Sequence, residues 1–404
     1  MQFDNIIIGS GLAACGAALA IPRSESVLVF AGPASGRMHY YDQRKSVPCA
    51  FDGFGGLGQS WHGVIPLRLF EAGTRQEQRA WLEQYQALFR KLYPRTKIEN
   101  YLFENRIFIP WRPIRPTKVW KQVRARREGA LEMLHANVAH FAVAANHADV
   151  TDTSGSRYAC SRLWIAAGAL GTPRLLEHSL NASVGSGHVS DHLLLYIGSV
   201  QGETPPASRY TPDGILLPAS YSDDGAALYT LRPARFSFRS LDFGIEQRAA
   251  FGMPTGALLK KFSRRLSPGL LAEAIYLRTG VAGRPEYHSL YAQVRVGGAY
   301  TIGRSERPLE MRDDAIQQAA KIARAGVPYS RVRYSMREDL FIPGIHLHGS
   351  VSMQKLRSNG MNIAGGVAHV LDASIMEDIG AEHHSFKMMA MAFKTVASEL
   401  ALRR

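Results

Sequence analysis

The stretch FDNIIIGSGLAACGAALA, residues 3–20, decides how the chain begins to fold. Three isoleucines after Asn5 are typical of a short buried strand, and the small residues after Gly11 favour a helix. Between them, Gly9, Gly11 and Ala14 form a GxGxxA turn. The first glycine of such a turn permits a tight bend, the second lets the backbone approach a pyrophosphate, and the alanine lets the helix pack on the strand. The stretch therefore predicts a site for FAD or NAD; the alternative is a tight turn without a ligand.

One partner expected of such a site is missing from its usual place. The second strand, residues 26–30, is followed by Ala31 and Gly32, where an acidic residue normally binds the adenosine ribose. The ribose is then held by backbone groups or by Ser35 and Arg37, or the cofactor binds less tightly.

Composition places the chain among ordinary globular proteins. Its 404 residues are 46% hydrophobic and 20% charged, enough for one large or two ordinary domains. The three cysteines are far apart and form no CxxC pair, which argues against a disulfide framework or a thiolate metal site. The first strand begins almost at Met1, and no apolar run reaches the ~18 residues of a membrane span. We therefore expect a cytoplasmic protein without a metal ion.

The net charge of +14 is concentrated in two basic segments. Residues 106–127 hold eight basic side chains and no acidic one, and residues 260–278 mix basic and apolar side chains. Both segments suit a solvated basic face. The alternatives are an anionic or lipid-linked substrate, or peripheral association with a membrane surface. A nucleic-acid partner is not expected, because the chain shows no helix-turn-helix, zinc or RNA-binding signature.

Periodicity predicts how the rest of the chain is organised. We expect helices over residues 75–93, 118–135 and 312–326, an extended stretch over 106–117 and short strands within 137–165. Residues 195–340 carry no cofactor signal and are interpreted as a reduced substrate-binding domain. The predicted fold is α/β: a Rossmann-like cofactor domain with a parallel sheet, built from residues 1–194 and 341–404, plus an α+β substrate domain with an antiparallel sheet.

Several segments, taken in order, resemble the glucose–methanol–choline (GMC) flavin oxidoreductases, whose two-domain architecture is like that of p-hydroxybenzoate hydroxylase. The first resembles the family's flavin-cradling loop, and is most like that of its sugar-oxidising pyranose oxidase branch. The others resemble its second signature, the segment after it and the catalytic end. In this order the segments are FGGLGQSWHGVIP (54–66), AAGALGTPRLLEHS (166–179), VGSGHVSDHL (184–193), HLHGSVSM (346–353) and LDASIMEDIGAEHHSFKMMAMAFK (371–394).

The resemblance implies roles for single residues. His346, three residues before Gly349, falls on the catalytic base, and His383 falls on the second active-site position. His384 begins the helix that would aim its free N–H groups at the flavin, whereas His348 is the neighbour expected to pack. Ser60 precedes Trp61 where some relatives carry a tethering histidine, so FAD is expected to bind non-covalently. The implied cofactor residues are Gly9, Gly11, Ala14, Gly56, Ser60, Trp61, His62, Val138, Gly168, Asp372 and His384.

The resemblance implies an FAD-dependent oxidoreductase acting on the CH–OH group of a sugar, glycoside or glycosylated natural product. The chain is short for the family, so an open flavin site favours a dehydrogenase over an oxidase. Two alternatives remain: a redox-neutral lyase, isomerase or cyclase on the same scaffold, and a non-catalytic binding protein. The sequence does not specify the oligomeric state.

Overall fold

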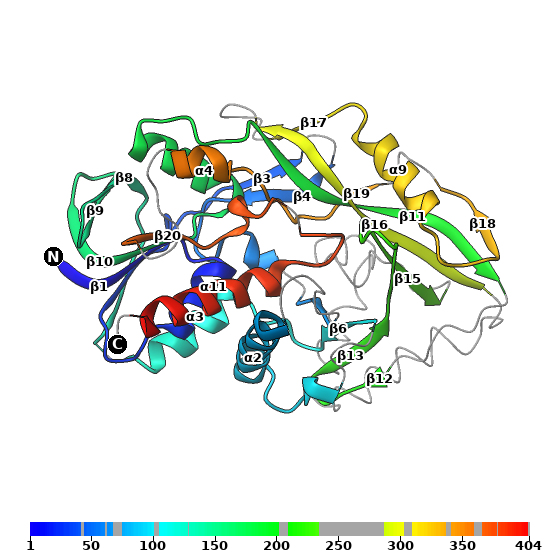
Figure 1. Cartoon of the computed structure of the whole chain (residues 1–404), viewed down its shortest axis with the longest axis horizontal. Helices are drawn as coiled ribbons and strands as arrows, with labels where there is room; N and C mark the ends of the chain where they lie inside the picture. The colour runs from blue at the N-terminus through cyan, green and yellow to red at the C-terminus, as the bar shows by residue number, and fades with distance from the viewer. Residues whose placement is uncertain are drawn as a thin grey trace.

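A computed structural model describes the chain apart from short gaps and one long segment. The described residues are 1–41, 44–60, 63–67, 75–100, 105–127, 129–201, 209–233, 287–302, 309–336, 341–358, 366–377 and 379–402. Two large sheets lie side by side along the long axis of the molecule, one parallel at its centre and one antiparallel (Figure 1).

The first sheet contains the strand predicted at the start of the chain. Its strand order is β7-β2-β1-β10-β9-β8, with β20 paired to the far end of β10. Strands β7, β2, β1, β10 and β20 run parallel, whereas β9 and β8 return antiparallel. The strands are β1 (Gln2–Ile8), β2 (Val27–Phe30), β7 (Leu131–Leu134), β8 (Val138–Val143), β9 (Ala148–Asp152), β10 (Arg157–Ile165) and β20 (Ala368–Val370).

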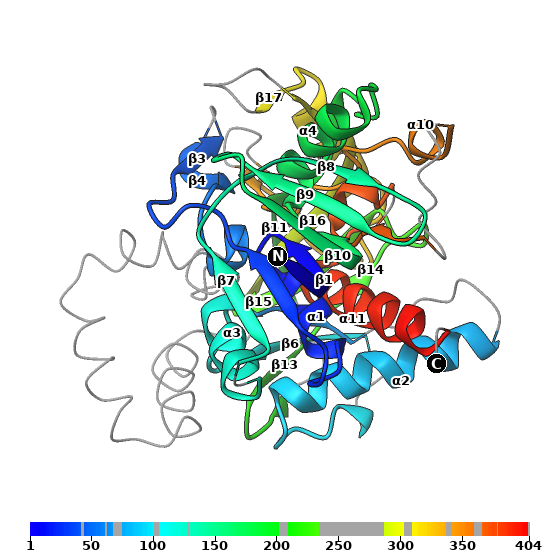
Figure 2. The same cartoon turned by 90° about the vertical axis from the view of Figure 1, so that its left-hand side faces the viewer.

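Helices cover both faces of this sheet (Figure 2). Ile7 points to a core shared with α1, α2, α3 and α11, whereas Ile6 and Ile8 point to a second core shared with α4 and α10. This alternation explains the run of isoleucines, because a strand buried on both faces needs apolar side chains at every position. The helices are α1 (Leu12–Ala20), α2 (Arg75–Leu92), α3 (Pro116–Ala125), α4 (Gly168–Leu180), α10 (Met353–Ser358) and α11 (Ser385–Ala401).

The two ends of the chain meet in the first of these cores. Helices α1 and α11 lie so close that a Cβ atom on Gly16 would sit 2.1 Å from the carbonyl oxygen of Met389. The contact explains why α1 consists of small residues, since larger ones would hold the two backbones apart.

The second large sheet is antiparallel and follows the order β14-β15-β16-β11-β18. Strands β17 and β19 add to β16 and β11, and α9 packs on this sheet through Ala315, Ala319 and Ala323. Residue 194, where the sequence predicts that the cofactor domain gives way to the substrate domain, lies inside β11. The boundaries of the two domains remain a prediction. The elements are β11 (His188–Gln201), β14 (Ser220–Tyr221), β15 (Ala227–Pro233), β16 (Tyr287–Ile302), β17 (Leu309–Met311), α9 (Ala315–Ala325), β18 (Val332–Tyr334) and β19 (Ile342–Pro343).

Two small sheets and three short 3₁₀ turns complete the described elements. One sheet has the order β12-β13-β6-β5, and the other pairs β3 with β4. The elements are β3 (Met38–Tyr41), β4 (Arg44–Phe51), η1 (Gly56–Ser60), β5 (Ile65–Pro66), η2 (Ile98–Asn100), β6 (Arg106–Pro110), β12 (Arg209–Tyr210), β13 (Gly214–Pro218) and η4 (Ala373–Ile375).

The predicted helix over residues 118–135 is wrong at both ends. Helix α3 begins earlier, at Pro116, because proline fits the first turn of a helix. It ends at Ala125, and Leu131–Leu134 form strand β7 instead. Gly129 separates the two elements in a left-handed conformation with φ of +77°, which no helix accommodates.

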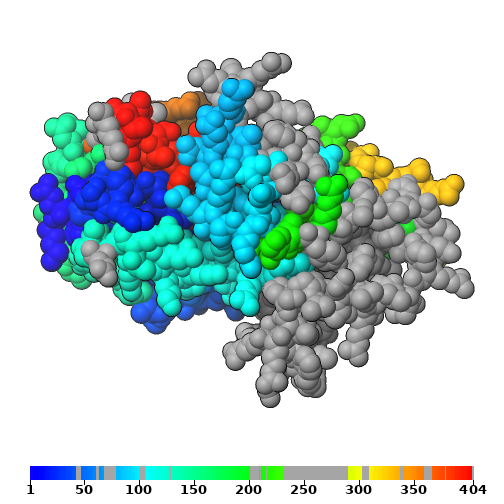
Figure 3. All heavy atoms as spheres, turned by 90° about the horizontal axis from the view of Figure 1, so that it is seen from below, coloured from blue at the N-terminus to red at the C-terminus, as the bar shows by residue number. Residues whose placement is uncertain are grey.

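The first basic segment, residues 106–127, is divided between core and surface. Arg106 and Arg127 are buried, and the guanidinium of Arg127 donates to the carbonyls of Ile21 and Glu25. The other six basic residues are exposed. Three of them, Lys118, Lys121 and Arg124, belong to α3, which is drawn cyan in Figure 3. The second basic segment, residues 260–278, lies outside the described residues. Within the described part of the chain, no helix is long and apolar enough to cross a membrane.

The close approach of α1 and α11 generates a prediction about stability. Replacing Gly16→Ala forces the two helices apart and should lower the free energy of unfolding by about 1–3 kcal/mol. Urea denaturation followed by circular dichroism measures this. Gly297→Ala is the matched control, because a Cβ there meets nothing within 4 Å. If the two variants are equally stable, the close packing of α1 on α11 at Gly16 is contradicted.

Candidate functional site

A cavity of about 640 Å³ opens where β1, β2 and β10 end. Its lining brings together predicted residues from distant parts of the chain: Gly9, Gly11, Gly56, Ser60, Val138, Gly168, His346, Asp372, His383 and His384. Ala14, in the first turn of α1, is fully buried in the core, as its packing role requires. Trp61 and His62 lie outside the described residues.

The Gly9 turn has the geometry of a close approach. Its φ of +108° is unfavourable for residues with a side chain, and a Cβ atom would lie 2.1 Å from the carbonyl oxygen of Ala166. The hydroxyl of Ser10 donates to the carbonyl of Ala31 at 2.9 Å and accepts from the backbone N–H of Gly55 at 2.8 Å. Ser10 thereby ties the turn both to the end of β2 and to the loop that continues into η1.

Three helices begin at the cavity wall, namely α1, α4 and α11. Their N-cap residues are Gly11, Ala167 and His384, and no described side chain of these residues caps its own helix. None of the three helices has an acidic residue in its first turn. Since a helix N-terminus carries unsatisfied N–H groups and a partial positive charge, the parts of the cavity next to the starts of α1 and α11 favour anions.

Asp372 connects two of the segments around the cavity. One of its oxygens accepts from the backbone N–H of Gly168 at 2.8 Å and from the hydroxyl of Thr172 at 2.5 Å. The other accepts from the backbone N–H of Ser374 at 2.9 Å. Asp372 therefore holds the start of α4 against the strand end after β20.

Five buried histidines cluster where α11 begins, and three of them, His346, His383 and His384, line the cavity. The ring of His346 lies 5.3 Å from that of His383 and 4.9 Å from that of His384, measured between centroids. His348 is fully buried, does not line the cavity, and contacts the carbonyl of His346 through Nδ1 at 2.9 Å. The fifth member, His192, comes from β11.

Asp191 lies beneath the cluster and holds its backbone. Its Oδ1 accepts from the backbone N–H groups of His346 at 2.8 Å and His192 at 2.7 Å. Its Oδ2 accepts from the hydroxyl of Tyr41 at 2.8 Å. Burial raises the pKa of Asp191 to about 7, although these hydrogen bonds favour the charged form.

The same burial keeps two of the imidazoles neutral. The pKa of His192 is well below its usual value because the ring is desolvated and because His346 and His348 are close. The pKa of His384 is lowered for the same reasons. Neutral imidazoles can accept protons or bind metal ions.

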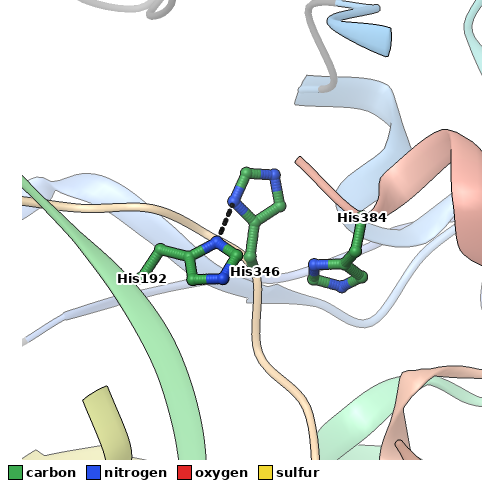
Figure 4. A group of neighbouring side chains, drawn as sticks. All are labelled: His192, His346 and His384. Atoms are coloured by element: carbon green, nitrogen blue, oxygen red, sulfur yellow. Dashed lines mark hydrogen bonds between the residues drawn. The ribbon is translucent and has the colours of Figure 1, made fainter. Parts of the chain in front are cut away.

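Three of these rings, those of His192, His346 and His384, have the spacing of a metal site (Figure 4). One nitrogen from each lies within 4.8 Å of the others. However, Nδ1 of His192 is also 3.2 Å from the side-chain amide nitrogen of Gln293, which donates to the carbonyl of Ala381 at 2.8 Å. An N–H donor directed at a ligand nitrogen disfavours a metal there, and the absence of a metal ion remains a prediction.

Sequence reasoning missed four residues at this site: Asp52, Asp191, His192 and Gln293. Asp191 and His192 lie in a quoted segment, where an Asp-His pair inside an apolar run was the available signal. Gln293 is one of several polar residues in a long strand, and nothing in the sequence distinguished it from the others.

Asp52 occupies the region where an acid was expected after β2. It follows β4, lines the cavity, and its carbonyl would lie 3.5 Å from a Cβ on Gly32. Its carboxylate contacts Nε2 of His39 at 2.6 Å. Ser35 and Arg37, the sequence-based candidates, do not line the described cavity.

The parallel sheet, the glycine turn and the adjoining antiparallel sheet define a two-domain α/β fold with one large cavity at the ends of the parallel strands. The crystal structure of pyridoxine 4-oxidase from Mesorbium loti is similar to the whole chain, with a TM-score of 0.52 and 14% sequence identity over 100% of both chains. This likeness confirms the predicted fold class. No protein-family model matches the chain, and no curated protein matches it in sequence.

The raised pKa of Asp191 generates a prediction about pH. A folded-state pKa of about 7, above the unfolded value of ~3.9, means that the fold binds this proton more tightly. Relative to Asp191→Asn, the wild-type protein should therefore lose stability as pH rises from about 4 to 7, by up to ~1.4 kcal/mol per pH unit. Urea denaturation of both proteins at several pH values measures the difference between their free energies of unfolding. The titration of the other groups contributes equally to both proteins and drops out of this difference. A constant difference would contradict the assignment.

Proposed function

We propose that the protein is an FAD-dependent oxidoreductase that oxidises a CH–OH group to a carbonyl. The observation that carries this proposal is one cavity that is lined both by the glycine turn and by the His346–His383 pair. The fold likeness to an enzyme described as an oxidase of pyridoxine supports the same class.

The residues around the cavity fit FAD. The N-terminus of α1, directly after the Gly9 turn, would hold the pyrophosphate, because its first N–H groups are uncapped and Gly11 has no side chain to block the approach. Val138 lies on the cavity wall where its backbone would meet the adenine, and Asp372 and Gly168 would flank the ribityl chain. When bound, FAD supplies the hydride acceptor, flavin N5. A non-covalent cofactor is proposed.

The histidines perform the proton transfer in this proposal. Neutral His346 accepts the hydroxyl proton of the substrate, while the carbon that bears the hydroxyl loses a hydride. His383, whose ring lies next to that of His346, holds the substrate oxygen. The uncapped N-terminus of α11 stabilises negative charge that develops nearby.

A sugar, glycoside or glycosylated natural product is the proposed substrate class, and a dehydrogenase is preferred to an oxidase. Both rest on the resemblance of residues 54–66 to the flavin-cradling loop of sugar-oxidising relatives and on the reduced substrate region. A redox-neutral reaction on the same scaffold is the alternative. The missing acid after β2 motivated it, and Asp52 on the cavity wall weakens that motive.

The first test of the proposed function is an absorption spectrum of the purified protein, before and after anaerobic addition of sugars and alcohols. We expect a flavin spectrum that one of these compounds bleaches. His346→Asn should keep the flavin and slow its bleaching by ~10²–10⁴-fold, the usual contribution of a general base. Protein that binds no FAD, or a His346→Asn variant that reacts at the wild-type rate, would refute the proposal.

A second proposal concerns the exposed basic residues of α3 and its neighbours. We propose that Arg112, Arg115, Lys118, Lys121, Arg124 and Arg126 attract an anionic or lipid-linked substrate, or a membrane surface, to a protein located in the cytoplasm. We expect co-sedimentation with anionic vesicles at low salt, lost at high salt. Lys118→Glu combined with Lys121→Glu should weaken it, whereas no sedimentation at low salt would exclude the membrane.

A further inference from the structure

The hydrogen bonds of His192 assign the proton on its neighbour His346. Nε2 of His192 lies 2.7 Å from the carbonyl oxygen of Gly380. A carbonyl oxygen only accepts hydrogen bonds, so Nε2 of His192 carries the proton. The ring is neutral because burial disfavours its charged form. Nδ1 of His192 therefore has a lone pair and no proton.

Gln293 leads independently to the same conclusion. Its amide nitrogen donates to the carbonyl of Ala381 at 2.8 Å, which fixes the orientation of the amide. The same nitrogen lies 3.2 Å from Nδ1 of His192 and directs its second hydrogen there. Two carbonyl oxygens, on Gly380 and Ala381, thus make Nδ1 of His192 an acceptor.

Nδ1 of His346 lies 3.3 Å from this acceptor, the contact drawn as a dashed line in Figure 4. An unprotonated Nδ1 on His346 would direct its lone pair at that of His192 and repel it, so Nδ1 of His346 carries a proton. The single lone pair of His192 Nδ1 is then shared by two N–H donors, those of Gln293 and His346. His346 is buried beside other imidazoles, a setting that disfavours a charged ring. A neutral imidazole has a single N–H, and its other nitrogen, Nε2, must then be the acceptor. In Figure 4 that second nitrogen points away from His192.

We propose that His192 is a positioning residue that holds His346 in the tautomer with a lone pair on Nε2. The inference rests on the proposed function, in which His346 is the base. It explains how a base is ready before the substrate binds, since only an unprotonated nitrogen can accept the hydroxyl proton. Because the Gly380 carbonyl takes no proton, His192 ends the chain of hydrogen bonds and leaves the accepted proton on His346.

The surroundings hold this arrangement in place. His192 is fully buried, and its backbone N–H shares Oδ1 of Asp191 with the backbone N–H of His346. The two rings are thus anchored to one carboxyl group. Neither ring can turn over without breaking a buried hydrogen bond, which costs roughly 1–3 kcal/mol.

Two substitutions separate the acceptor on His192 from its bulk. His192→Leu fills the space without an acceptor and should slow anaerobic flavin reduction by roughly 10²-fold, with a similar substrate Kd. His192→Asn places an oxygen near the position of Nδ1 and should restore most of that rate. His369→Leu is the matched control, because His369 is a buried histidine that stacks on Trp164 outside the cluster. If the flavin of His192→Leu is reduced at the wild-type rate, the proposal is overturned.

A spectroscopic test works whether or not a substrate is known. In the FAD-bound protein with ¹⁵N-labelled histidine, nitrogen chemical shifts distinguish protonated from unprotonated ring nitrogens, and His346→Asn identifies the signals of His346. In the wild-type protein we expect Nδ1 of His346 to be protonated and Nε2 to be unprotonated. In His192→Leu we expect the proton to lie on Nε2 instead, or the two nitrogen shifts to average. A protonated Nε2 in the wild-type protein would overturn the proposal, as would one equivalent of zinc removable by EDTA. Flavin that no compound bleaches would refute the proposed function and leave this result standing.

Discussion

The carboxyl group of Asp191 is the interaction on which the geometry of the histidine cluster depends. It comes from β11 of the antiparallel sheet, yet it binds the backbone of His346, which belongs to the segment after β19. The same oxygen fixes the backbone of His192. A single buried group therefore sets the distance between two rings from separate parts of the chain. Burial of such a group is costly, and the three donors around it offset that cost.

Single side chains also join separate segments around the glycine turn. Ser10 joins the glycine turn to β2 and to the loop before η1, and Asp372 joins the start of α4 to the strand end after β20. These side chains leave the N–H groups at the start of α1 uncapped, and an anion can satisfy them. The cavity is thus lined by polar side chains that already have hydrogen-bond partners in the protein, together with helix N–H groups that no side chain caps.

Local signals explain what could be predicted from sequence. The Gly9–Gly11–Ala14 spacing predicts the turn because each position has a backbone or packing requirement that few residues meet. His346 and His383 were found through a resemblance of whole segments, not through spacing alone. His192 and Gln293 were missed because their roles arise from register: β11 and β16 must pair before these side chains face one another. The helix predicted over 118–135 is too long, because apolar spacing alone does not show that the helix ends before Gly129 and that an edge strand follows it.

The packing of α1 against α11 has a consequence for the synthesis of the protein. Helix α1 ends at Ala20 and α11 begins at Ser385, so nearly the entire chain must leave the ribosome before the two can meet. At usual elongation rates the interval is on the order of tens of seconds. Throughout it, the small apolar face of α1 lacks its final partner, and only segments made earlier, such as β10 and α3, can cover it.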